Sequence, residues 1–581
     1  MHQFTSSKGA SPITNGYSFE RTVLLTAMIL LGTICVVNLF VLGAYLFHSE
    51  LPQGLFVFAV IASLALPFLF VSKLGFTTSA ITLPVTISVG VLSLSLLASW
   101  FYFDLSWDGQ WYQQAAVYNL AKGWNPLFNP LVTPDHTDNT SILHFPKSTW
   151  YFGAAVLQLF GTVEMGKAYN FILLFAAFGV VYPFCRSLNL SKGRSTIFAL
   201  LVLFNPVVWS EVTTYLNDGD LYLLLVIYLT AIILWLGEAK PIYLVIAIMA
   251  ICCLVNTKFT GLVFFLVSAL FLFVYVIIRH RQRVKPFLLS HLLAGMLAIG
   301  VFGFNPYITN TIQRGHPLYP LMGTQAYPSV FASGKDSNEA YETPHNMQGQ
   351  SLPVRLFYAN FGQPGNAPYN HEKFAILVNP FNTNTAHWTA YHYHETRVSG
   401  FGPYFGISLI LMLIALPLVL WGEKRFWLPT VFFMAALICC LSFSQHFWWP
   451  RFFPMLWLAP LLPLLLKWNR EATSQSNPII RFAFGWLPAA LLCLNGLIVA
   501  TVHMQWETNA SISLRRDLQQ LQNDNRPIEI RYGSFKRSIE EKLKYWDIRF
   551  KPVKLKRKDP TVHKLPSVVE GYPNQVIYRQ E

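Results

Sequence analysis

The sequence predicts an α-helical bundle that crosses a membrane about thirteen times, followed by a small α/β domain outside the membrane. Of the 581 residues, 53% are hydrophobic and 12% are charged, whereas soluble domains carry roughly 25% charged residues. The apolar residues gather in runs close to the length of about 20 residues that spans a bilayer. Basic residues gather in the short connections between these runs, as in the cytoplasmic loops of membrane proteins. We therefore expect a transmembrane domain over residues 1–502 and an external domain over residues 503–581.

The expected spans follow one another through short connections, except at two long polar loops. These loops cover residues 100–167 and 305–401. The thirteen expected spans lie near residues 22–47, 54–72, 78–99, 168–185, 195–210, 219–236, 241–257, 260–279, 287–304, 402–421, 427–445, 452–467 and 479–502.

The orientation follows from the basic run between Arg279 and Lys285, which carries four positive charges in a short connection. Such runs lie on the cytoplasmic side, which places the N-terminus in the cytoplasm and both long loops and the tail outside. This count requires that the apolar run from Trp150 to Phe160 does not cross. At about eleven residues the run is shorter than a span, so we expect an interfacial or re-entrant helix.

The first long loop and the tail are expected to contain structure of their own. Trp107, Trp111, Ala115 and Tyr118 recur at helical spacing and predict an interfacial helix that ends near Gly123. In the tail, the pattern predicts helices over 513–521 and 538–543 and strands over 527–532, 548–553 and 576–578.

The net charge of +14 would indicate a nucleic-acid partner in a soluble protein. In a membrane protein it is typical of cytoplasmic loops and of attraction to anionic lipids, so we expect membrane lipids and no nucleic acid as partners. The sequence contains no P-loop, no glycine-rich dinucleotide turn and no Gly-x-Ser-x-Gly motif.

Two carboxylates, Asp104 and Asp108, follow the third expected span. Beside a membrane surface they could serve as a general base or as metal ligands, or they could be ordinary acidic residues of an external loop. A second group, Glu211 and Asp218, lies in a short external turn and could border a polar cavity, although Asn-Asp-Gly is also common turn chemistry.

Basic residues at the expected external ends of the spans are candidates for contact with phosphate. His144 and Lys147 precede the short apolar run, where a lysine could bind a lipid phosphate or simply extend toward the headgroups. Arg451, near His446, carries positive charge on the external side, against the usual bias. Arg314 is a further candidate cation.

Histidines also gather at the end of the second long loop, at His387, His392 and His394, followed by Glu395. Their spacing matches no standard zinc motif, so we expect contact with a sugar or a headgroup here and assign no metal site.

The region from 100 to 220 resembles the GT-C superfamily of polytopic membrane glycosyltransferases, in particular the lipid A aminoarabinose and protein O-mannosyl transferases. The resemblance is carried by Asp108-Gly-Gln-Trp-Tyr112, by Ala-Val-Tyr-Asn-Leu-Ala-Lys-Gly123 and by His144-Phe-Pro-Lys147-Ser-Thr-Trp150. Two departures are visible. Lysine follows proline here rather than preceding it, and the Asp-Glu pair of the aminoarabinose branch is Asp-Gly, which leaves a second carboxylate or a metal open.

The resemblance implies transfer of a sugar from a polyprenyl-phosphate donor to a lipid, glycan or protein acceptor, with inversion at the anomeric carbon. Asp108, or else Asp104, would be the general base. Lys147 and Arg451, with Arg314 and His446 as second choices, would bind the phosphate leaving group. His144, Glu211 and Asp218 would border the substrate. No cofactor is implied with certainty, although a divalent metal ion is possible.

The expected location is a bacterial inner membrane with the tail in the periplasm, in a pathway of cell-envelope glycan biosynthesis. Two alternatives stay open: a lipid-linked glycan polymerase or ligase, and a non-enzymatic flippase or transporter of lipid-linked glycans. A transporter would need polar residues inside several spans.

Overall fold

A computed structural model describes residues 19–69, 79–129, 139–329, 343–365, 374–377, 385–421, 423–473, 477–556, 560–565 and 576–580. The protein is mostly helical (73%), with a small sheet near the C-terminus. Within the described residues, eight helical segments are long and apolar enough to cross a membrane. They are Phe19–Leu46, Ala80–Phe101, Val163–Ser187, Asp218–Glu238, Phe259–Arg279, Arg281–Phe302, Lys424–Leu441 and Pro478–Asp524. These helices indicate a membrane protein.

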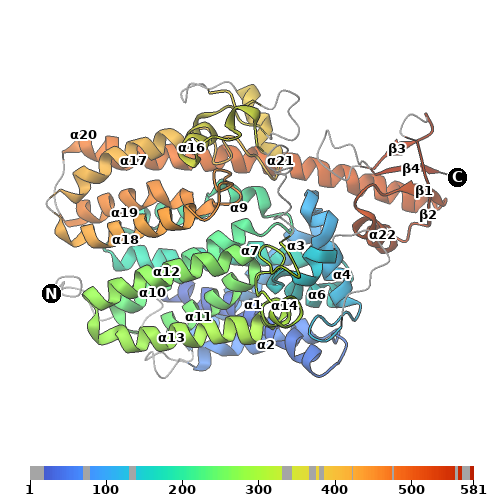
Figure 1. The fold of residues 1–581 in the computed structure, drawn as a ribbon, viewed down its shortest axis with the longest axis horizontal. Coiled ribbons are helices and arrows are strands. Elements are labelled where there is room, and N and C mark those ends of the chain that lie inside the picture. Colours follow the sequence, from blue (N-terminus) through green and yellow to red (C-terminus); the bar gives the residue numbers. More distant parts are fainter. Residues whose placement is uncertain are drawn as a thin grey trace.

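Some helices of the first half, among them α10 and α12, run side by side along the long axis of the molecule (Figure 1). α1 packs against α7, α2 and α3, and α10 packs against α7 and α11. The bounds are α1 Phe19–Leu46, α2 Leu55–Ala65, η1 Leu66–Leu69, α3 Ser79–Phe101, η2 Gly109–Gln113, α4 Gln114–Ala121, α5 Asn139–His144, α6 Ser148–Phe160, η3 Val163–Lys167, α7 Ala168–Ser187, α8 Lys192–Leu203, α9 Pro206–Glu211, α10 Asp218–Glu238, α11 Pro241–Thr257 and α12 Phe259–Arg279.

The second half adds a further layer of helices, in which α17 packs against α19 and α21, and α12 packs against α18. The bounds are η4 Arg281–Arg283, α13 Val284–Leu297, η5 Ala298–Phe302, η6 Phe304–Ile308, α14 Thr309–Arg314, η7 His345–Met347, α16 Leu352–Phe361, η8 Thr385–His392, α17 Phe405–Leu420, α18 Lys424–Leu441, η9 Pro454–Trp457, α19 Leu458–Thr473, α20 Pro478–Arg481, η10 Phe482–Trp486 and α21 Leu487–Asp524.

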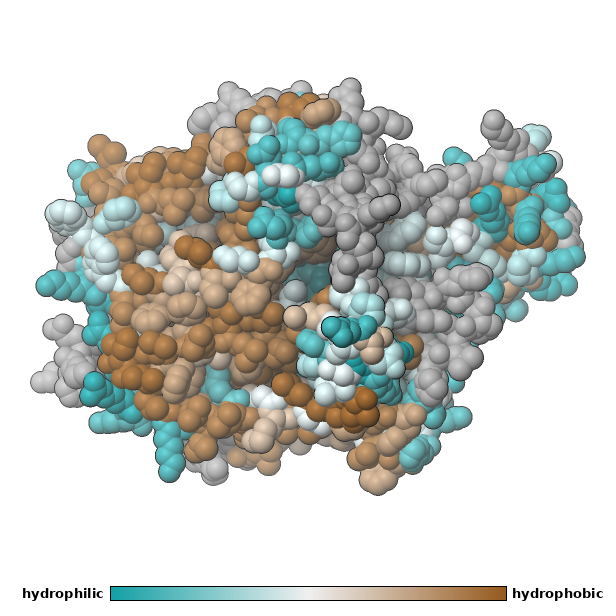
Figure 2. All heavy atoms as spheres, in the orientation of Figure 1, coloured by the Kyte–Doolittle hydropathy of each residue, from teal (hydrophilic) through white to brown (hydrophobic). Residues whose placement is uncertain are grey.

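Large apolar side chains are exposed on the outer helices of the bundle. Examples are Leu270 on α12, Leu289 and Leu292 on α13, and Ile438 on α18. In Figure 2 the brown surface covers the part of the molecule that these helices form, whereas teal residues gather at its ends and on the tail. Contiguous apolar surface of this extent is typical of a protein in contact with lipid.

Each of the thirteen expected spans coincides with helical structure, but the number of crossings stays a prediction. Leu55–Leu69, Pro241–Thr257 and Phe405–Leu420 are apolar but shorter than the eight long segments. The expected span at 195–210 is divided between α8 and α9, because Asn205 ends one helix and caps the next through a hydrogen bond to Val207 N–H (3.1 Å).

The short run at 150–160 forms α6, which has 13 residues and so a length of about 20 Å. Ten of its residues, from Ser148 to Leu157, are buried. The helix packs against α1, α2 and α4. It therefore lies within the protein, at the end of the bundle from which the tail projects (Figure 1).

The tail contains the predicted strands and one that the sequence pattern did not reveal. The sheet has the order β2-β1-β4-β3, with β1 Ile528–Arg531 parallel to β2 Phe550–Pro552 and antiparallel to β4 Ile577–Gln580. The unpredicted strand, β3 His563–Lys564, is only two residues long and pairs with β4. The helix predicted over 538–543 is α22 Lys536–Tyr545.

The tail is joined to the bundle by α21, which continues without a break through residue 503 as far as Asp524. The hydrophobic core of the tail combines residues such as Leu518 and Ile530 with Phe103 and Leu105 of the first long loop. The helix predicted in that loop is present as η2 and α4 and packs against α22.

Candidate functional site

The guanidinium group of Arg451 lies among four carboxylates. Its Nη2 is 2.5 Å from Asp108 Oδ2, its Nη1 is 2.7 Å from Glu395 Oε1, and its Nε is 3.0 Å from Asp218 Oδ2. Glu211 Oε1 lies 3.7 Å from the same Nε. All three guanidinium nitrogens thus face acidic partners. We call these five residues the Arg451 cluster.

Segments far apart in the sequence supply the cluster. Asp108 precedes η2, Glu211 ends α9, Asp218 begins α10 and Glu395 follows η8. Arg451 lies in the turn between α18 and η9. At the first turn of α10 the helix dipole stabilises the negative charge of Asp218, and Glu211 accepts a hydrogen bond from the N–H of Gly219 (2.8 Å).

Lys258, between α11 and α12, adds a second cation, with its Nζ 2.5 Å from Asp218 Oδ1. Burial alone would lower the pKa of Arg451, but Glu395, Asp108, Asp218 and Glu211 raise it well above its usual range. The arginine therefore stays protonated, and it offsets the repulsion among carboxylates that would otherwise be buried close together.

Asp108 is one of the more accessible members of this cluster. Its side chain is 23% exposed, whereas those of Glu211 and Asp218 are 3% exposed. Oδ2 binds Arg451, and Oδ1 makes no hydrogen bond to any of the described residues. A hydroxyl group at this position could therefore approach a carboxylate oxygen that is held in place but has no partner.

Gly109, the residue after Asp108, stands where a larger residue would not fit. A Cβ at position 109 would lie 2.0 Å from Asp104 Oδ2 and 2.5 Å from Ser106 Oγ. The backbone therefore approaches Asp104 too closely for any side chain.

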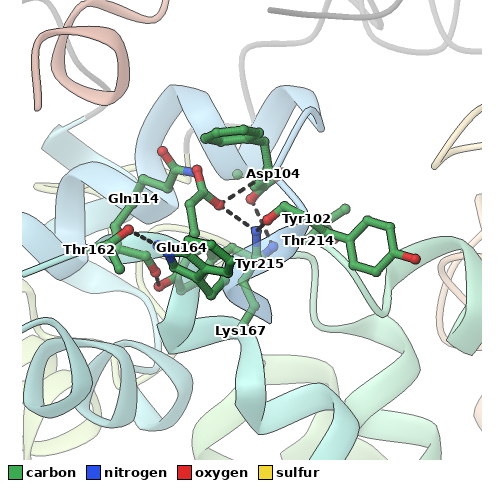
Figure 3. A network of polar contacts seen from close by, with 12 residues as sticks. Tyr102, Asp104, Gln114, Thr162, Glu164, Lys167, Thr214 and Tyr215 are labelled. Carbon is green, nitrogen blue, oxygen red and sulfur yellow. Dashed lines mark hydrogen bonds and ion pairs between the residues drawn. The ribbon is translucent and has the colours of Figure 1, made fainter. Parts of the chain in front are cut away.

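Asp104 itself belongs to a separate, fully buried network (Figure 3). Oδ1 accepts hydrogen bonds from the N–H (2.9 Å) and Oγ (2.6 Å) of Ser106, and Oδ2 accepts one from the N–H of Tyr215 (2.8 Å). Burial raises the pKa of Asp104, opposed by the nearby charge of Lys167. With both oxygens occupied, Asp104 is placed to hold the first loop against the turn before α10.

The same network connects the tail with the bundle through Glu164, which accepts a hydrogen bond from the N–H of Asp104 (2.9 Å). Its Oε2 is bonded to Lys167, and its Oε1 lies 3.6 Å from Lys542 of α22. Burial lowers the pKa of Lys542, whereas Glu164 raises it. Glu164, Lys167 and Lys542 were not predicted from the sequence.

A second group of predicted residues gathers around His144 and contains cations without carboxylate partners. His144 Nδ1 lies 2.7 Å from Asn310 Oδ1. Burial, together with the positive charges of Lys147 and Arg314, lowers the pKa of His144 to about 4. His144 is therefore neutral near pH 7. We call His144, Lys147 and Arg314 the basic cluster.

Lys147 and Arg314, the other two members of the basic cluster, differ in their surroundings. Lys147 is buried, and its Nζ donates to the carbonyl oxygens of Phe145 (2.7 Å) and Leu143 (2.9 Å). Burial lowers its pKa well below the usual range. Arg314 is partly exposed between the rings of Tyr319 and Tyr327, and its Nε is buried without a hydrogen-bond partner. Neither cation forms an ion pair with any of the described carboxylates.

Aromatic rings connect the two clusters. Tyr112, one helical turn after Asp108, contacts Phe145 and Trp150 with centroid distances of 6.2 Å each. The ring of Phe145 packs on the ring of Phe259, with a centroid distance of 5.9 Å. Phe259 directly follows Lys258, which binds Asp218 of the Arg451 cluster. Contacts among four rings thus link the segment that follows Asp108 with the segment that carries Lys147.

The remaining predicted residues lie outside these contacts. His446 is partly exposed in the turn before Arg451, and its ring makes no polar contact within the described residues. His387 is paired with Gln363, whereas His394 contacts Glu507. The histidines of the second loop are therefore divided between different partners.

Lys258 shows which signal in the sequence was missed. It is a basic residue at the expected external end of an apolar run, which is the same feature that made Arg451 a candidate. His503 and Glu507, which meet His394, stand four residues apart at the end of an apolar run, a spacing that places both on one helix face.

Comparison of the chain with protein-family models, with curated proteins and with solved structures finds no match.

The close approach at Gly109 leads to a prediction. Gly109→Ala is expected to displace Asp104 and to lower the free energy of unfolding by about 1–3 kcal/mol, as in other overpacked sites. Thermal unfolding of the purified protein in detergent measures the change. Gly90→Ala, with no atom near the new Cβ, is the matched control. Equal melting temperatures for the two variants would contradict the packing described here.

Proposed function

We propose that the protein is a membrane glycosyltransferase of the GT-C type, which transfers a sugar from a polyprenyl-phosphate donor on the external face of the membrane. The observation that carries the proposal is the presence of two unlike clusters that are linked by ring contacts. One presents a partly exposed carboxylate, Asp108, and the other presents basic side chains that no carboxylate among the described residues neutralises.

In this proposal Asp108 is the general base. Its Oδ2 is fixed by Arg451, and its Oδ1 would accept the proton of the acceptor hydroxyl as that oxygen attacks the anomeric carbon. The bond from the anomeric carbon to the phosphate oxygen breaks at the same time, and the lipid phosphate leaves with the electron pair. A positioned base contributes about 10²- to 10⁴-fold to such a step.

The phosphate would be bound by the basic cluster rather than by Arg451. Each guanidinium nitrogen of Arg451 already faces a carboxylate, whereas Arg314 has an unpartnered Nε and is partly exposed. Burial lowers the pKa of Lys147, and a bound phosphate would favour its protonated form. Its positive charge would then act in surroundings of low dielectric constant, where its effect is stronger than in water. Developing charge on the leaving group is what such fixed cations stabilise.

Two other functions would need some of the same features of the site. A lipid-linked glycan polymerase or ligase would also need a base and a phosphate site, and it differs by adding a whole chain rather than one sugar. A flippase or transporter would need charged residues at the middle of several spans. Both clusters described above lie at helix ends and in connections, which favours an enzyme at the membrane surface.

The proposal includes an orientation, with Arg281–Arg283 in the cytoplasm and the tail outside, in the periplasm of a bacterial cell. Gln282→Cys and Asn523→Cys place single exposed thiols at these two positions. We expect a membrane-impermeant maleimide to label only Asn523→Cys in intact spheroplasts and both variants after lysis. The unmodified protein gives the background of the seven native thiols. Labelling of Gln282→Cys in intact spheroplasts would reverse the orientation.

Asp108→Asn is expected to reduce sugar transfer by about 10²- to 10⁴-fold because the amide cannot accept the proton. Transfer of radiolabelled sugar from polyprenyl-phosphate hexoses and pentoses to membrane acceptors measures the rate. Glu395→Gln is the matched control, since it removes one carboxylate from the same arginine without touching the proposed base. Full turnover by Asp108→Asn, or an equal loss in both variants, would refute the assignment of Asp108.

Arg314→Gln and Lys147→Met are expected to weaken binding of the lipid phosphate by about 10- to 100-fold each, the effect of losing one charge-assisted hydrogen bond or fixed charge. Lys147→Met should leave the melting temperature unchanged or raise it, because it removes a buried charge that lacks a counter-ion. Binding of undecaprenyl phosphate by the purified protein measures the affinity. Lys122→Met, on the same loop but half exposed and paired with Glu541, is the control. Unchanged affinity in both cluster variants would exclude the phosphate site.

A further inference from the structure

A buried group of two histidines and a glutamate lies outside the two clusters used above. His394 follows η8, and His503 and Glu507 stand one turn apart on α21. Their side chains are 0–1% exposed. One donor atom from each residue lies within 4.8 Å of the other two.

One hydrogen bond fixes the tautomer of His503. Its Nδ1 lies 3.1 Å from the carbonyl oxygen of His392, and because a carbonyl only accepts, Nδ1 carries the proton. Nε2 is therefore the nitrogen with the lone pair, and it is directed toward Glu507 at 4.0 Å from Oε1. A backbone carbonyl that holds the far nitrogen in this way is characteristic of histidines that bind metal ions.

The contact between His394 and Glu507 leaves part of the group without partners. His394 Nε2 is bonded to Glu507 Oε1. His503 Nε2 and Glu507 Oε2 are buried and make no hydrogen bond to any of the described residues. Buried polar atoms are nearly always satisfied, and a single cation would accept the lone pairs of all three side chains at once.

We propose that His394, His503 and Glu507 form a site for a transition-metal ion, with Zn²⁺ as the ion that this donor set suits best. Two imidazole nitrogens and one carboxylate oxygen are a set found in zinc sites with three protein ligands. A tetrahedral ion with bonds of about 2.0–2.1 Å keeps neighbouring donors about 3.3 Å apart, so the carboxylate of Glu507 moves slightly away from His394 when the ion binds.

The site joins the second external loop to α21. Its consequence for the rest of the protein comes through Glu395, which follows His394 directly and binds Arg451 at 2.7 Å. His394 also lines a small cavity together with Glu395 and Arg451. The ion is thus a positioning element for the Arg451 cluster, and the inference does not depend on which reaction the protein carries out.

The test uses the full-length protein in detergent, stripped with EDTA and desalted, then titrated with Zn²⁺ alone. We expect one equivalent of Zn²⁺ to bind per chain and to raise the melting temperature. We expect H503Q and E507Q to weaken binding on the order of 100-fold and to abolish the thermal shift. His387→Gln, a histidine of the same loop outside the site, is the control and should behave like the unmodified protein.

Substitution with Co²⁺ provides a readout that does not depend on the variants folding. A Co²⁺ ion held by two histidines and a carboxylate should give the visible absorption of a tetrahedral site in the unmodified protein. Absence of both Zn²⁺ binding and the Co²⁺ spectrum would overturn the proposal and leave a simple His394–Glu507 hydrogen bond. Equal binding by H503Q, E507Q and the unmodified protein would overturn it as well.

Discussion

The arrangement of the bundle ends depends on the neutralisation of buried carboxylates by Arg451. Asp108, Glu211, Asp218 and Glu395 come from four separate segments, and no pair of these segments is adjacent in the sequence except α9 and α10. Without a central cation, bringing such charges out of water would cost several kcal/mol for each ion. The planar, forked guanidinium meets three of them through different nitrogens, which a lysine could not do. The turn after α18 therefore sets the position of the first loop, the α9–α10 turn and the second loop together.

Much of this site could be predicted from the sequence, because polar residues at the ends of apolar runs are conspicuous. Asp108, Glu211, Asp218 and Arg451 were selected on that ground alone, and the structure brings them into contact. What the sequence did not reveal was which partners these charged residues bind. Arg451 was expected to bind phosphate, and only its three-dimensional neighbours show that its charge is matched within the protein. Lys147 and Arg314, in contrast, have no carboxylate neighbour of this kind among the described residues.

The fold was predictable to a similar degree. Apolar runs and helix-breaking residues located the long helices but not the short ones in the loops, such as α5, α14 and α16, and the residue pattern of the tail located three of the four described strands. The short strand β3 carries too few residues for any periodic pattern, and the number of membrane crossings depends on burial that composition does not determine. α6 illustrates this point, since an apolar helix of 13 residues could be lipid-facing or internal. Its burial against α1, α2 and α4 is a result of packing between distant segments. Contacts such as His394 with Glu507, 113 residues apart, are beyond local patterns for the same reason.

The continuity of α21 has a mechanical consequence. The helix has 38 residues, or about 57 Å, and it begins in the apolar bundle and ends at the sheet of the tail. A helix of this length behaves as a stiff rod, so a displacement of its end in the tail is transmitted to its end in the bundle. His503 and Glu507 lie between these ends, where the rod meets the second loop. A force on the tail would therefore reach the second long loop through α21, without contact with either of the charged clusters.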